Sequence, residues 1–132
     1  MAGFWVYCVQ KNIDRSGGAD PPGAVGESMH LSKQIESMYD DAVRIRQDLH
    51  RIPEIGFQLR DTQAYVLREL RQCSPDRIET PAVCGIKAVF FAKDAETTIA
   101  FRADMDGIHN EEANDVPYCS QHPGNMHGCG HD

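Results

Sequence analysis

The C-terminal run from His127 to Asp132 holds the side chains best suited to chemistry in this 132-residue chain. Cys129 and His131 lie two positions apart, and residues at that spacing in an extended segment point to the same side. A thiolate and an imidazole are ligands that zinc and other borderline divalent ions accept. The glycines on both sides of the cysteine let the backbone curl close to such an ion. Residue types and spacing leave two interpretations open: a metal site, or a small-residue tail in which thiol and imidazole alternate.

A second candidate group, made of two carboxylates, follows the predicted strand Thr97–Ala103. Asp104 and Asp106 also lie two positions apart, and their mutual repulsion is relieved by a cation or a proton. Ligand sites gather at the carboxyl ends of strands in α/β sheets. The alternative is an ion pair between Arg102 and Asp104 at a solvated strand end.

The charge of the chain is concentrated in its last 39 residues. These carry eight acidic residues and one basic residue, Arg102, whereas residues 1–93 carry 12 of each sign, so the net charge of −7 lies wholly in the C-terminal part. Such an acidic segment is either a solvated loop or a cation site. Its sign argues against nucleic acid and anionic membranes as partners, and no apolar run approaches the length of a transmembrane helix. Five cysteines without paired spacing favour a reducing, cytoplasmic compartment over a disulfide scaffold.

The elements that must position these residues are two helices followed by strands. Apolar residues that step by three and four predict a helix from Ser32, as N-cap, to about Arg51, where Pro53 stops it. A second helix is expected over Leu59–Gln72, with its inner face formed by Leu59, Val66, Leu67 and Leu70. β-Branched and aromatic residues then predict strands at Arg77–Thr80, Ile86–Ala92 and Thr97–Ala103, the last two as a hairpin. This order predicts an α/β fold.

The first 28 residues read differently from the rest. Residues 11–28 are rich in Gly, Pro and Ser without an apolar period, so we expect residues 1–28 to be a disordered leader and Met29 to be the natural start. The apolar patch Phe4–Tyr7 lacks the basic flank and cleavage pattern of a signal peptide.

Several motifs, in this order, resemble a known family. The segments Asp48–Phe57, Arg102–Asp106, Pro117–Ser120 and Met126–Asp132 are similar to the N-terminal segment of the aminoacylase-type metallopeptidases. The match is to the amidohydrolase branch that includes hippurate hydrolases and hydrolases of N-acyl and indole-acetyl amino acids. The resemblance implies that residues 29–132 are the N-terminal part of a three-layer, zinc-peptidase-like catalytic domain, incomplete at the metal motif.

The resemblance also implies an activity and a set of roles. It implies hydrolysis of the amide bond of a small N-acyl amino acid by two divalent ions (Zn, Mn, Co or Ni). Cys129 and His131 are the implied metal ligands, and Asp106 is implied to lie beside the metals, supporting catalysis by orienting a ligand. The other ligands and the general base would lie further along the chain, so we expect this chain alone to be an inactive fragment of a full-length protein that can form a homodimer.

Two departures from the family pattern stand out. Residues 107–110 (Gly-Ile-His-Asn) replace an Ala-Leu-Pro-Ile-like stretch, which makes His109 an additional polar group near the site. Gly128 replaces a commoner alanine. Two other functions remain open: a small non-enzymatic metal-binding or interaction module that uses Cys129, His131 and His127, and an exopeptidase or dipeptidase of the same family. A disordered acidic adaptor conflicts with the helical period of residues 35–49.

Overall fold

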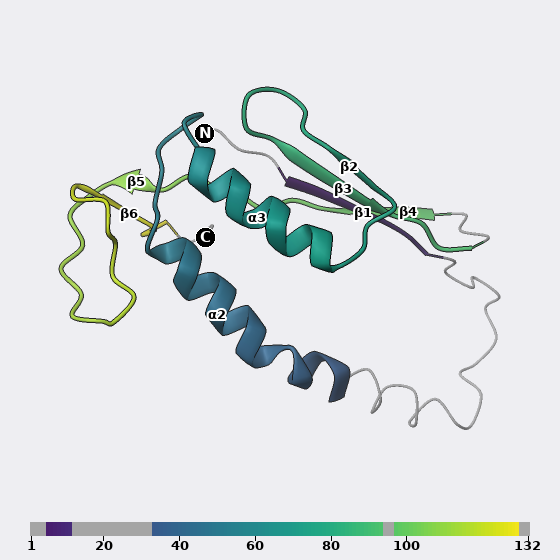
Figure 1. Cartoon of the computed structure of the whole chain (residues 1–132), viewed down its shortest axis with the longest axis horizontal. Coiled ribbons are helices and arrows are strands. Elements are labelled where there is room, and N and C mark those ends of the chain that lie inside the picture. The colour runs from purple at the N-terminus through teal and green to yellow at the C-terminus, as the bar shows by residue number, and fades with distance from the viewer. Residues whose placement is uncertain (1–4, 12–32, 94–96, 130–132) are drawn as a thin grey trace.

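The fold combines two helices with a mixed sheet and a short β-ribbon (Figure 1). The computed structural model describes residues 5–11, 33–93 and 97–129. Helices α2 (Tyr39–His50) and α3 (Arg60–Gln72) precede most of the strands. The strands are β1 (Trp5–Lys11), β2 (Arg77–Glu79), β3 (Ile86–Phe90), β4 (Thr97–Phe101), β5 (Ile108–His109) and β6 (Asn125–Met126). The predicted α/β class is confirmed.

Both predicted helices are present, and the chain between them turns sharply. Residues 33–37 are helical, and after a break at Met38 the helix α2 runs to His50. Ser32, the expected N-cap, lies outside the described residues. Pro53 ends the helical stretch as predicted. Helix α3 is capped by Glu54, which precedes it in the turn: its Oε2 accepts the backbone N–H of Thr62 at 2.7 Å, where a carboxylate also complements the helix dipole.

The core lies between α3 and the sheet. Leu59 and Leu70 from the helix region pack with Ile86 and Ala88 of β3, and Val66 and Leu67 are partly buried against the same cluster. The predicted inner face of this helix is therefore confirmed. Met105, just after β4, belongs to the same core, so the strand end that carries Asp106 is anchored directly to it.

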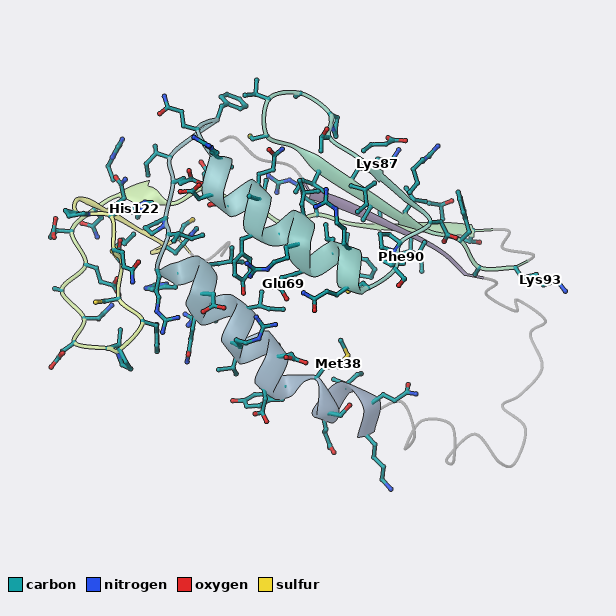
Figure 2. All side chains as sticks on the ribbon, in the orientation of Figure 1. Met38, Glu69, Lys87, Phe90, Lys93 and His122 are labelled. Atoms are coloured by element: carbon teal, nitrogen blue, oxygen red, sulfur yellow. The ribbon has the colours of Figure 1, made fainter. Side chains whose placement is uncertain are left out.

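Helix α2 is attached to α3 by polar contacts. Arg44 Nη2 lies 3.0 Å from Glu69 Oε2, and Tyr65 donates its hydroxyl to Asp48 Oδ2 at 2.8 Å. Figure 2 shows Glu69 between the two helices and Met38 at the end of α2 that points away from the sheet. The apolar stripe that predicted α2 is only partly covered, because Met38 and Tyr39 are 64% and 67% exposed.

Strand β1 corrects two predictions. The four-stranded sheet has the order β2-β3-β1-β4, in which β1 pairs parallel with β3 and antiparallel with β4. Residues 5–11 are thus a central strand where a disordered leader was predicted. The predicted hairpin is also wrong, because β1 lies between its two strands. Residues 1–4 and 12–32, with Met29, lie outside the described residues.

A proline in β1 tests its central position. Val9 is in register with both Phe90 of β3 and Ile99 of β4, so its N–H belongs to a ladder that a proline interrupts. We expect Val9→Pro to lower the free energy of unfolding by about 2 kcal/mol or more, measured by urea denaturation. Val9→Thr, which keeps the N–H and β-branching, is the control. Equal stability of V9P and the unmodified chain would contradict this sheet order.

Candidate functional site

The predicted site residues fall at two places in the structure. Asp106 is half-buried just after β4, and Cys129 is half-buried near the end of the described residues. His131 and Asp132 lie outside the described residues. Within residues 33–93 and 97–129, no three His, Cys, Asp or Glu side chains are grouped so that they could hold a metal ion. The described part therefore contains Cys129 as one candidate ligand and does not form a complete coordination set.

Asp104 and Asp106, which both follow β4, interact with different groups. Arg102 Nη2 donates to Asp104 Oδ1 at 2.6 Å, which is the ion pair that the alternative interpretation of this segment predicted. Asp106 is half-buried, and its charge acts on the Cys84 thiol. Burial raises the pKa of Cys84, and the charges of Asp106 and Glu54 raise it further, so Cys84 stays a protonated core thiol.

The segment between the two candidate sites is fastened to the turn that follows α2. The last carbonyl groups of a helix have no partner within the helix, and carbonyls at and just beyond the end of α2 accept hydrogen bonds from both ends of this segment. The bonds run from Gly107 N to Glu54 O at 2.7 Å, from Gln121 N to Arg51 O at 2.9 Å, and from His122 Nδ1 to Pro53 O at 2.9 Å. Figure 2 shows His122 in the loop beside the β5–β6 ribbon. The residues after Asp106 and those before His127 are thus held on one support.

Gly107 explains one departure from the family pattern. A Cβ atom at this position would lie 2.9 Å from both Met126 O and Pro53 Cβ, which is closer than real contacts allow. A Cβ at Gly128 would meet only the flexible side chain of Met126, so an alanine there is easily accommodated. His109, the other departure, makes a hydrogen bond through Nδ1 to Asn125 Oδ1 at 3.0 Å across the ribbon.

A buried carboxylate–imidazole pair joins the loop between β5 and β6 to α2. His50 Nε2 lies 3.0 Å from Glu112 Oε1, and these side chains are 8% and 4% exposed. Glu112 Oε1 also accepts the Asn114 amide at 3.2 Å, and Oε2 accepts the backbone N–H of Ser120 at 2.6 Å. The hydrogen bond from His50, together with that from Ser120, lowers the pKa of Glu112 to about 2. Glu112 is therefore a carboxylate near neutral pH, which makes His50 Nε2 the donor.

Neither Glu112 nor its contact with His50 was predicted from the sequence. Glu112 was one of eight acids in an acidic segment, and its partner lies 62 residues away in the sequence. The signal that was available is a histidine in the last turn of a helix that ends before a proline. The ring of His50 also lies 6.2 Å from the buried ring of His127, where the predicted metal motif begins.

The donor types of the motif fit a borderline divalent ion. A cysteine thiolate and imidazoles suit zinc, cobalt or nickel better than calcium or magnesium. Cys129 is half-buried, close in sequence to a buried imidazole. This fit concerns donor chemistry alone, because the second implied ligand, His131, lies outside the described residues.

Comparisons with known proteins give the family. Residues 100–132, which include Asp106, Cys129 and His131, match the model described as peptidase family M20/M25/M40. This C-terminal segment is therefore similar to that family. The expected resemblance to an amidohydrolase-type metallopeptidase family is thereby confirmed.

Curated proteins match this chain over more than two thirds of its length. It is 43% identical over 96 residues to an N-acetyldiaminopimelate deacetylase of Exiguobacterium sibiricum, a match that covers 69% of this chain and 25% of the relative. It is 45% identical over 94 residues to the protein of the same name from Bacillus subtilis, covering 70% and 25%. The chain thus spans about a quarter of the length of these relatives. No solved structure matches it.

The membrane prediction can be checked in part. Neither helix in the described part of the chain has the length and apolar character needed to cross a bilayer.

The acid titration of Glu112 should appear in the stability of the protein. Its pKa is about 2 in the folded state and ordinarily 4.5, so the unfolded state binds the proton first as the pH falls. We expect the free energy of unfolding to decrease as the pH falls between these two values, and Glu112→Gln to remove that part of the decrease. Urea denaturation across this pH range measures it. Glu111→Gln, at an exposed neighbour, should keep the full dependence; an unchanged slope in E112Q would contradict the assignment.

Proposed function

We propose that the protein acts as a metal-dependent amidohydrolase on the amide bond of a small N-acyl amino acid. The observation that carries this proposal is the family match over residues 100–132, which contains all three predicted site residues. The names of the relatives support an acetyl group as the acyl part and do not extend to the benzoyl group of hippurate-like substrates. The match of residues 100–132 to a family that generally depends on divalent metals supports the metal.

In this proposal each site residue has a separate role. Cys129 and His131 hold a divalent ion, which when bound supplies polarisation of the scissile carbonyl and activation of water. Asp106 holds an imidazole or tunes its basicity, as carboxylates commonly do next to ligating histidines. The hydrogen bond from Gly107 to Glu54 and the burial of Met105 support this role, because they fix the backbone on both sides of Asp106.

The chemistry of the cysteine ligand also favours a reducing compartment. A thiolate ligand is lost when it is oxidised, and no disulfide joins the cysteines whose side chains are described. We therefore propose a cytoplasmic setting. The names of the relatives favour a small-molecule substrate. The number of ions, the choice among Zn, Mn, Co and Ni, and a homodimer of the full-length protein belong to the same proposal.

A chimera tests the activity. We expect an enzyme in which residues 40–132 replace the aligned segment of the Bacillus subtilis relative to release acetate from N-acetyldiaminopimelate. Cys129→Ala in the chimera should lower the rate at least about 100-fold, because it removes a ligand. The matched control is Cys119→Ala, at an exposed thiol of the same segment, which should keep the rate. A folded chimera without activity would contradict the proposal.

The isolated chain separates the proposal from the module interpretation. An amidohydrolase that draws ligands from elsewhere predicts weak zinc binding by residues 1–132 alone. Tight binding of one zinc ion with a gain of helical circular dichroism would instead favour a metal-binding module that folds around its ion.

A further inference from the structure

Glu112 has a place in the loop that no other described carboxylate has. Its two oxygens accept donors from three directions: a helix side chain (His50), a loop side chain (Asn114) and a loop backbone N–H (Ser120). The carboxylate therefore closes the loop 112–120 on itself and fastens it to the last residue of α2. Since the side chain is only 4% exposed, water cannot easily replace these donors.

The His50 ring that Glu112 holds lies next to His127, the first residue of the metal motif. His50 meets Tyr118 edge-on, with ring centroids 5.7 Å apart, and lies 6.2 Å from the ring of His127 at a tilt of 40°. Tyr118 is covered on another side by Arg46 of α2, whose Cζ is 6.0 Å from the ring centroid. The ring of His50 at the end of α2 therefore lies beside both the loop and the start of the motif, and Glu112 fixes the orientation of that ring.

We propose that Glu112 is a positioning residue: by holding His50 it keeps the segment His127–Cys129 seated against the end of α2, on the support that also fixes the backbone next to Asp106. The inference rests on the proposed function only in taking Cys129 to be a metal ligand that must be held in place. Glu111, the neighbouring carboxylate, accepts the N–H of Gly124 at 2.9 Å and makes no described contact with α2. It offers a matched comparison within the same loop.

The test measures how fast the Cys129 thiol is alkylated, which increases when its segment is no longer held in place. The full 132-residue chain and its E112Q and E111Q variants are treated with iodoacetamide without metal, and mass spectrometry of peptides gives the alkylation rate of each cysteine. Cys84 in the core is the internal reference for global unfolding. Glutamine has the size of glutamate but only one acceptor oxygen, so E112Q changes the bonds and keeps the volume.

We expect E112Q to raise the alkylation rate of Cys129 about tenfold relative to that of Cys84, the factor associated with loss of a hydrogen bond to a charged group, and E111Q to leave the ratio unchanged. His50→Gln breaks the same bond from the other side and should give a similar ratio. The double variant should add little to either single one. An unchanged ratio in both E112Q and H50Q, or a parallel rise of Cys84 and Cys129, would overturn the inference.

Zinc separates the positioning role from the proposed function. We expect Zn²⁺ to slow the alkylation of Cys129, with the concentration for half-protection about tenfold higher in E112Q, as for residues that support metal ligands. Absence of protection in the unmodified chain would contradict Cys129 as a ligand and leave the metal-free ratios as the measure of the positioning role. Equal half-protection in E112Q and the unmodified chain would count against the positioning role.

Discussion

The arrangement of the candidate site depends on carbonyl groups of the turn that follows α2. Pro53 prevents the helix from continuing, and the carbonyls of Arg51, Pro53 and Glu54 are then available to other donors. Three donors from the segment 107–122 take them. Residues 51–54 thus fix the position of this segment both just after the sheet and just before the metal motif. Because these bonds come mainly from the backbone, they tolerate many side chains while holding both ends in place.

The acidic C-terminal part is stabilised mostly by hydrogen-bond donors and little by basic side chains. Glu111 and Glu112 accept backbone N–H groups from Gly124 and Ser120, and Glu112 also accepts His50. Asp104 has the guanidinium of Arg102. The two sequence interpretations of this charge, a solvated loop or a cation site, therefore omitted a third solution: a loop folded around its own carboxylates. Among the described acids of this segment, backbone N–H groups thus compensate part of the charge of Glu111 and Glu112.

The parts that the sequence predicted are those with strong local signals. The two helices have a clear apolar period and a proline stop, and the inner face of α3 is the one expected. The motifs around Asp106 and Cys129 were recognisable from residue order. Strand β1 was missed, although residues 5–11 contain aromatic and β-branched residues, because the following Gly- and Pro-rich stretch suggested disorder. The pair of His50 and Glu112 was missed because it joins residues 62 positions apart, and a single sequence carries no signal for such a contact.

The close contact at Gly107 has a consequence for how this protein differs from those it resembles. With a hydrogen atom in place of a methyl group, the backbone of Met126 can approach Pro53 across a gap that a single added carbon would fill. An alanine at position 107 of this chain would therefore require the ribbon and the turn to move apart. The lack of a side chain at Gly107 thus sets how closely the strand before His127 can lie against the turn that follows α2.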